Sequence, residues 1–204
     1  MALGDLEELG NFGAVVAIEP STGAVEVMAS NKSYDPNRIP DEIGKLIDNK
    51  IETPLLNRAP QGLYPPGSTF KVVTAAAGLE SGTITPETTI DAPGTLEVEG
   101  TPLQNDFNES FGPIALDTAL TNSVNTWFAQ VGDRVGEDTL FEYMERFGFN
   151  SKPAIDLPSE QLVASGVVDL ESGAVLTKED PIDIARVAIG QERPFLPLWA
   201  HRPI

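Results

Sequence analysis

The stretch Pro65-Pro66-Gly67-Ser68-Thr69-Phe70-Lys71 is the most informative part of this 204-residue chain. Its prolines and glycine make a stiff approach to Ser68. A helical pattern then runs to Leu79, and Gly82 is suited to end a helix. Residues three apart on a helix share one face, with Cβ atoms about 5–6 Å apart. We therefore expect the amine of Lys71 to lie within reach of the Ser68 hydroxyl.

This serine–lysine pair predicts nucleophilic chemistry. A serine hydroxyl is a weak nucleophile unless a neighbouring base takes its proton. Lysine serves as that base only when its pKa falls well below about 10.4. Apolar neighbours (Phe70, Val72 and Val73) and the positive end of a helix dipole both act in that direction. Spacing alone also fits a capping serine followed by a solvated lysine, but the Pro-Pro-Gly approach and the alanine-rich helix favour the chemical interpretation.

A second pattern, Ser123-Val124-Asn125, lies within the run 120–128. It places a hydroxyl and an amide on one short turn between two predicted helices. Helix capping explains this pattern better when it is taken alone, because Ser, Thr and Asn are all favoured as caps. The pattern gains weight from its position after Ser68 and Lys71, with helical sequence between the two.

The remaining sequence predicts a mixed α+β domain. An apolar run at 14–18, turn residues at 19–23 and a second run at 24–29 predict an antiparallel hairpin. Other segments predict the tail of a helix at 1–12, a loop at 33–59 with a short helix near 43–46, and short strands and loops at 83–113. Helices are predicted at 68–79, 115–120, 125–131, 138–147 and 181–189.

Composition limits the kinds of partner and site. The chain has 13 basic and 31 acidic residues, giving a net charge of −18, which opposes binding to nucleic acid or anionic lipid. It contains no cysteine, and His201 is its single histidine. Disulfides and thiolate metal sites are therefore excluded, and no metal or other cofactor is predicted. No apolar run approaches the roughly 20 residues that span a bilayer, and no signal-peptide pattern opens the chain.

The two motifs, in this order, resemble the Ser-x-x-Lys and Ser-x-Asn motifs of the penicillin-recognising serine enzymes, whose third motif is Lys-Thr-Gly. The resemblance extends to the segments 13–25, 33–37 and 56–59, which are similar to the opening of the transpeptidase domain in class B penicillin-binding proteins. It covers roughly residues 12–191. It implies the α+β fold that penicillin-binding proteins share with serine β-lactamases.

The resemblance also implies a role for each of four side chains. Ser68 would be the acylated nucleophile, and Lys71 would be its general base. Ser123 would relay a proton between that lysine and the leaving amine, and Asn125 would hydrogen-bond the amide side chain of the substrate. The implied reaction is peptidoglycan cross-linking, in which a D-Ala-D-Ala peptide acylates the serine, D-Ala leaves and an acceptor amine takes the acyl group.

Further implications concern partners and location. β-Lactams would trap the same serine, and the natural partner would be a peptidoglycan stem peptide. Other cell-wall synthesis proteins, or a second copy of the chain, are the implied protein partners. Members of this family work outside the cytoplasm in association with the membrane, and no cofactor takes part.

The chain departs from the family pattern after Asn125. No Lys-Thr-Gly, Lys-Ser-Gly or His-Thr-Gly follows, and Ser21-Thr22-Gly23 lies ahead of the nucleophile. We therefore expect one partial transpeptidase domain over 1–204 whose C-terminal sheet strands are missing. It would comprise a hairpin and loop at 13–60, a nucleophile helix at 61–82 and a mostly helical lobe at 83–204.

Two alternatives stay open. Without the third motif, the chain could be a catalytically dead remnant that binds a partner. β-Lactamases and β-lactam sensors share the motif set, although the opening hairpin and the loop after it are similar to class B transpeptidases.

Overall fold

The computed structural model describes residues 12–169 and 172–191. These residues form two compact units. The first comprises 12–63 and 153–163, and the second comprises 64–152 and 164–191 without the two residues at 170 and 171. The predicted helix tail at 1–12 therefore lies almost wholly outside the described residues, as does His201.

The first unit is built on the predicted hairpin, which is confirmed. Strand β1 (Gly13–Ile18) pairs antiparallel with β2 (Val25–Asn31), and Val16 lies opposite Met28. The turn closes through a bond from the Gly23 N–H to the Glu19 carbonyl at 2.8 Å. Gly23 has a φ of 75°, a left-handed conformation that glycine adopts without steric cost.

A buried arginine organises the loop that follows the hairpin. The helices of this unit are η1 (Pro36–Arg38), α2 (Ile39–Asp48), α3 (Arg58–Gln61) and η4 (Ser159–Gln161). Arg58 at the start of α3 donates to the Glu52 carbonyl at 2.6 Å and to the Thr53 hydroxyl at 2.9 Å. Its backbone N–H donates to the Ser30 hydroxyl at 3.0 Å, so α3 is tied to strand β2. Helix α2 is longer than the predicted 43–46.

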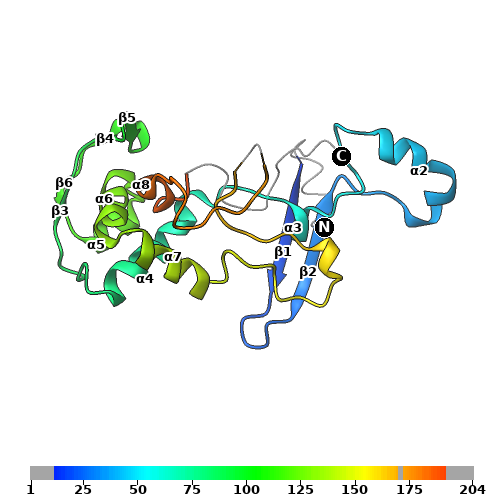
Figure 1. Ribbon diagram of the computed structural model, residues 1–204, viewed down its shortest axis with the longest axis horizontal. Helices are drawn as coiled ribbons and strands as arrows, with labels where there is room; N and C mark the ends of the chain where they lie inside the picture. The colour runs from blue at the N-terminus through cyan, green and yellow to red at the C-terminus, as the bar shows by residue number, and fades with distance from the viewer. Residues whose placement is uncertain (1–11, 170–171, 192–204) are drawn as a thin grey trace. The chain divides into compact units, whose positions relative to one another are not determined.

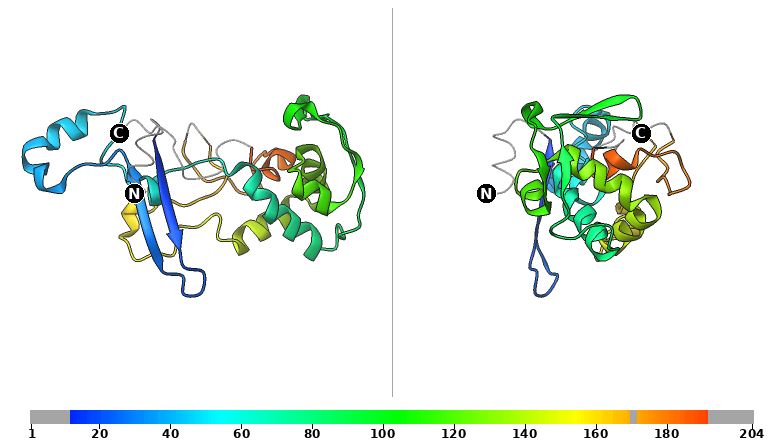
Figure 2. Two further views of the ribbon diagram at one scale, coloured as in Figure 1. Left: turned by 180° about the vertical axis from the view of Figure 1, so that it is seen from behind. Right: turned by 90° about the vertical axis from the view of Figure 1, so that its left-hand side faces the viewer.

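The second unit is the helical one, and α6 lies at its centre. Its helices are η2 (Gly67–Phe70), α4 (Lys71–Glu80), η3 (Asp106–Asn108), α5 (Leu116–Thr121), α6 (Asn125–Val135), α7 (Glu137–Arg146) and α8 (Ile184–Val187). Helix α6 packs against α4, α7 and α8, as Figures 1 and 2 show. The largest fully buried apolar side chains in this core are Trp127, Phe70, Phe128, Ile84, Leu140, Met144 and Ile189.

Short strands lie beside α6. Strand β3 (Ile90–Ala92) pairs with β6 (Gly112–Ile114), and β4 (Thr95–Val98) pairs with β5 (Thr101–Gln104). The short strands predicted at 83–113 are thus confirmed. The last predicted helix is shorter than 181–189, because Asp183 caps it by accepting from the Arg186 N–H at 3.0 Å.

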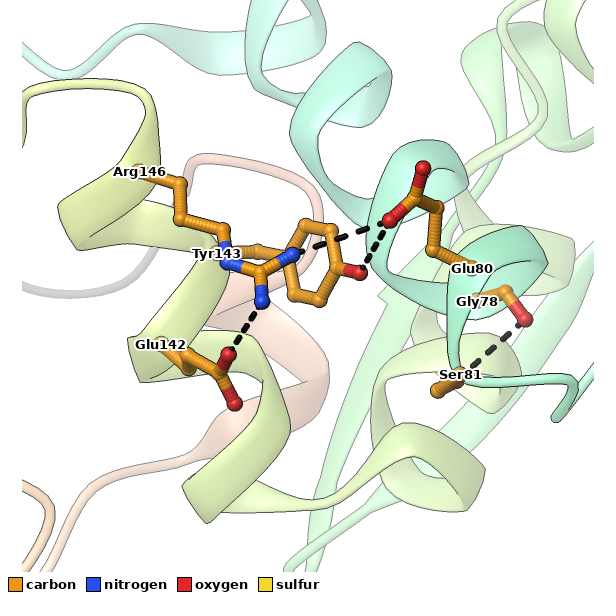
Figure 3. A network of polar contacts seen from close by, with 6 residues as sticks. All are labelled: Gly78, Glu80, Ser81, Glu142, Tyr143 and Arg146. Carbon is orange, nitrogen blue, oxygen red and sulfur yellow. Dashed lines mark hydrogen bonds and ion pairs between the residues drawn. The ribbon is translucent and has the colours of Figure 1, made fainter.

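A polar network ties α7 to the C-terminal end of α4 (Figure 3). The Tyr143 hydroxyl donates to a Glu80 carboxylate oxygen at 3.0 Å, and the Arg146 guanidinium lies 4.6 Å from the centre of the Tyr143 ring. Arg146 also pairs with Glu142 at 2.6 Å. The Tyr143 ring is buried, but the charged groups of Arg146, Glu80 and Glu142 are exposed, so each ion pair contributes little to stability. The network joins the last residue of α4, Glu80, to two residues of α7. No helix in the described part of the chain is long and apolar enough to cross a membrane.

Candidate active site

A buried amine, that of Lys71, lies at the centre of the site. Its Nζ atom is within hydrogen-bond distance of four oxygens: 3.1 Å from Ser68 Oγ, 2.9 Å from Ser123 Oγ, 2.6 Å from the Ser123 carbonyl and 2.7 Å from Asn125 Oδ1. Only 1% of the Lys71 surface is exposed. An ammonium group has three N–H donors and no acceptor, whereas a neutral amine accepts one hydrogen bond from a hydroxyl. The arrangement therefore suits an amine that exchanges a proton with a serine.

The 3₁₀ turn at 67–70 aligns the serine with the lysine. In a 3₁₀ helix, residues three apart are eclipsed, and the Lys71 N–H donates to the Ser68 carbonyl. Lys71 then begins helix α4, whose inner face is buried, while Ser68 remains exposed. The turn thus presents a hydroxyl to solvent and keeps its neighbouring amine in the interior.

The segment 188–190 supports this turn from behind. The Gly67 N–H donates to the Gly190 carbonyl at 3.0 Å, and the buried Thr74 hydroxyl donates to the Ala188 carbonyl at 2.7 Å. A Cβ on Gly190 would lie 2.3 Å from the Gly67 carbonyl oxygen. Only glycine fits there. The 3₁₀ turn at 67–70 is thus held on both sides of Ser68.

The turn between α5 and α6 aims Ser123 at the amine. Ser123 has a φ of 53°, a left-handed conformation that is uncommon outside glycine and that concentrates at functional sites. The Val124 N–H donates to the Ala119 carbonyl at 2.9 Å, and Val124 is buried. Together these features direct both the hydroxyl and the carbonyl of Ser123 toward Lys71.

The orientation of the Asn125 amide follows from its two partners. Its Nδ2 donates to the Gln104 carbonyl at 2.8 Å, while its Oδ1 accepts from Lys71. A carbonyl can only accept, so the amide nitrogen must face Gln104 and the oxygen must face the lysine. Strand β5 therefore sets the direction of the amide.

Burial changes the protonation of the lysine. It lowers the pKa of Lys71 from its ordinary value to about 8, and the Asp106 carboxylate partly opposes this by favouring the charged form. At pH 7, a pKa of 8 leaves roughly a tenth of the amine neutral, against fewer than about one in a thousand for an exposed lysine. The site therefore contains a base that is available near neutral pH.

The structure brings all four predicted side chains together. Ser68, Lys71, Ser123 and Asn125 meet around one amine, although the two motifs are separated by more than fifty positions in the chain. Sequence reasoning missed the Gln104 carbonyl, the Asp106 carboxylate and the Gly190 support. Nothing in the local sequence marks the first two, whereas Gly190 stands in a glycine–glutamine pair directly after a predicted helix. In the described residues, no three His, Asp or Glu side chains are grouped to hold a metal ion.

Most of the chain is similar in sequence to one family of known proteins. The family model described as the penicillin binding protein transpeptidase domain matches residues 13–175. The peptidoglycan D,D-transpeptidase MrdA of Escherichia coli (strain K12) is 38% identical over 158 residues, which cover 74% of this chain and 25% of that protein.

Solved structures of similar proteins match most of the chain. Penicillin-binding protein A from M. tuberculosis, solved as an imipenem acyl-enzyme complex, has a TM-score of 0.73 and 34% identity, covering 91% of this chain and 43% of that one. Penicillin-binding protein PBP2 from Helicobacter pylori, solved in complex with MreC, has a TM-score of 0.78 and 28% identity, covering 96% and 37%. The chain therefore spans about a quarter of the curated relative and less than half of either solved chain.

Proposed function

This chain belongs to the penicillin binding protein transpeptidase domain family, and we propose that it carries the serine acyl-transfer centre of a peptidoglycan D,D-transpeptidase. The observation that supports this most is the buried amine of Lys71, which lies 3.1 Å from an exposed serine hydroxyl. Covalent catalysis by serine requires such a base beside the nucleophile.

In the proposed acylation step, the Ser68 oxygen attacks the carbonyl carbon of the penultimate D-Ala. Its proton passes to the neutral amine of Lys71, and a C–O bond forms. The C–N bond then breaks, and the leaving D-Ala nitrogen takes a proton from the Ser123 hydroxyl, which recovers one from Lys71 at 2.9 Å. The products are an ester on Ser68 and free D-Ala.

The second step reverses the roles of the same groups. An acceptor amine attacks the ester carbonyl and loses a proton to Lys71 through Ser123, while the Ser68 oxygen leaves and regains its proton. Asn125 has two amide N–H groups, of which one donates to Gln104. We assign the other to a carbonyl of the bound peptide.

The oxyanion that develops during attack needs donors. The Ser68 backbone N–H is one of them, at the start of the 3₁₀ turn. The Lys-Thr-Gly motif, whose strand supplies a second donor in this family, does not occur in these 204 residues. Loss of one oxyanion donor typically lowers the rate by about 10²–10³. We therefore expect slow acylation by this chain alone.

The relatives also support a proposal about ligands, protein partners and location. Penicillin-binding protein A was captured as an imipenem acyl-enzyme, so β-lactams are the expected trapping ligands. PBP2 of H. pylori was solved with MreC, so proteins of cell-wall synthesis are the expected partners, with self-association as the other possibility. The expected location is outside the cytoplasm at the membrane.

Incubation with a fluorescent penicillin followed by intact-mass measurement tests the proposal. We expect one adduct, located on the peptide that contains Ser68, and none in Ser68→Ala. Ser81→Ala is the matched control, since that serine lies at the far end of α4 and should leave labelling unchanged. Absence of an adduct in a sample shown by circular dichroism to be folded would overturn the proposal. Rapid loss of the adduct would instead indicate a β-lactamase.

A further inference from the structure

A buried asparagine outside the two motifs connects two parts of the site. The Asn105 side chain is 6% exposed and lies between the loop after β5 and the start of α6. Its Oδ1 accepts from the Thr126 N–H at 2.9 Å. Its Nδ2 lies 3.0 Å from the Pro93 carbonyl, 2.8 Å from the Glu109 carbonyl and 3.1 Å from the Thr126 hydroxyl. Every polar atom of this side chain is thus engaged.

Asn105 supplies a cap that helix α6 lacks in its own sequence. The first N–H groups of a helix have no partner within it and are usually satisfied by a capping side chain. The residue at the cap position of α6 is Val124, which makes no side-chain hydrogen bond. Thr126 is the second residue of the helix, and its N–H is satisfied by Asn105 from 21 positions earlier.

The neighbours of this pair belong to the site. Gln104 precedes Asn105, and its carbonyl holds the amide of Asn125, which precedes Thr126. The last residue of β5 and the first residue of the loop after it therefore accept hydrogen bonds from two adjacent residues of the helix, at 2.8 Å and 2.9 Å. A shift of the loop moves the Asn125 amide, and with it a partner of the lysine.

The same asparagine secures a loop that is strained. Phe107 has a φ of 53°, a region that costs about 1–2 kcal/mol for a bulky residue, and Asn108 follows with a φ of 56°, which asparagine adopts more readily. The bond from Asn105 Nδ2 to the Glu109 carbonyl closes this loop, and the bond to the Pro93 carbonyl ties the loop to the turn between β3 and β4. Asp106, whose carboxylate acts on Lys71, lies within it.

We infer that Asn105, with Thr126, is a positioning residue for the acyl-transfer centre, holding Gln104 and Asn125 in the arrangement that surrounds Lys71. This inference rests on the proposed function for its effect on rate. It makes a separate prediction for the lysine itself, because a loosened loop admits water beside the amine.

Asn105→Ala removes the cap and the bonds to the Pro93 and Glu109 carbonyls. Thr126→Val removes only the hydroxyl, which donates to the Pro93 carbonyl at 2.8 Å and accepts from Asn105 at 3.1 Å. We expect acylation by fluorescent penicillin to fall roughly 10- to 100-fold in the first variant, since small misplacements near the chemistry have effects of that size. The second variant should show a smaller fall. It also serves as the test if the first does not fold.

Gln130→Ala is the matched control. Gln130 also ties α6 to a neighbour, strand β3, by donating to the Asp91 carbonyl at 2.8 Å, and it donates within the helix to the Thr126 carbonyl at 2.8 Å. Neither bond reaches the segment 104–109. A residue that only stabilises the fold would lower the melting temperature without altering the rate per folded molecule. We expect that outcome for Gln130→Ala.

A measurement that does not depend on acylation separates this inference from the proposed function. Titration of lysines labelled with ¹³C at the ε carbon follows Lys71 by NMR, and the signal is assigned by its absence in Lys71→Met. We expect the midpoint to rise by about one pH unit in Asn105→Ala, because water entry reverses the effect of burial. An unchanged midpoint in both Asn105→Ala and Thr126→Val, equal to that of Gln130→Ala, would overturn the inference. If the wild-type chain is not acylated but the Lys71 midpoint shifts in Asn105→Ala, only the proposed function is refuted.

Discussion

Gly190 lies directly behind the 3₁₀ turn at 67–70, where its carbonyl accepts from the Gly67 N–H at 3.0 Å. The approach is so close that a Cβ on Gly190 would lie 2.3 Å from the Gly67 carbonyl oxygen and 2.8 Å from its nitrogen. Because Gly67 immediately precedes Ser68, any movement there alters the position of the attacking hydroxyl. The glycine is therefore part of the support of the site, although it takes no part in the chemistry.

Gly190→Ala should reduce penicillin acylation far more than its backbone conformation explains. Gly82→Ala is the control, because Gly82 has a φ of 72° against 68° for Gly190 but open space where its Cβ would lie. Both variants carry the strain of a left-handed alanine, about 1–2 kcal/mol. Only Gly190→Ala also displaces the turn. Equal acylation rates in the two variants, measured below their melting temperatures, would show that the contact with Gly67 is unimportant.

Acylation should depend on pH through Lys71. Burial lowers the pKa of this amine to about 8, and the neutral amine is the form that accepts the serine proton. The rate constant should therefore rise about tenfold from pH 7 to a plateau above roughly pH 9. Stopped-flow fluorescence with a fluorescent penicillin measures this profile. The rate of spontaneous penicillin hydrolysis is measured at each pH and subtracted.

The carboxylate of Asp106 provides a control for that profile. It favours the charged amine, so Asp106→Asn should move the midpoint to lower pH. Asp117→Asn removes the same charge from helix α5 and should leave the midpoint where it is. A rate that is flat between pH 6 and pH 9, or equal shifts in the two variants, would argue against Lys71 as the base.

The pairing of Ser68 with Lys71 could be predicted from sequence for a physical reason, whereas the family, the fold class and the roles of Ser123 and Asn125 came from the resemblance of the motifs. Ser68 and Lys71 are close along the chain, so local helix geometry alone places them together. The hairpin at 13–31 follows from two short apolar runs separated by turn residues that include a glycine. The matched family and the similar solved structures confirm the resemblance drawn from these motifs.

Contacts that depend on tertiary packing could not be predicted. The Asn105 cap of α6 and the Gln104 carbonyl behind Asn125 join segments 21 positions apart. An asparagine in a polar loop has the same local sequence whether it faces solvent or caps a distant helix. The same limit applies to Ser123, whose left-handed φ of 53° is unusual for serine and has no signature in the neighbouring residues.

Stability should also vary with pH because of the buried amine. Its folded pKa of about 8 lies below the ordinary value of 10.5, so between these values the unfolded chain binds more protons. Since stability rises with pH wherever the unfolded state binds more protons, the free energy of unfolding should increase from pH 8 toward pH 10. Urea denaturation at a series of pH values measures this. Lys71→Met keeps a similar apolar stem, and in this variant the increase should disappear; its persistence would mean that another group is responsible.

Ser123 offers a test that separates chemistry from strain. Ser123→Ala and Ser123→Gly both remove the hydroxyl that lies 2.9 Å from Lys71, so both should lose roughly 10²–10⁴ in acylation rate if that hydroxyl transfers protons. Glycine adopts a φ of 53° without the steric cost that alanine meets. The free energy of unfolding of Ser123→Gly should therefore exceed that of Ser123→Ala by about 1–2 kcal/mol. Thermal melting and acylation kinetics on the same samples give both quantities. Rate losses that followed the stability difference, with the glycine variant retaining activity, would show that Ser123 matters for its backbone rather than for its hydroxyl.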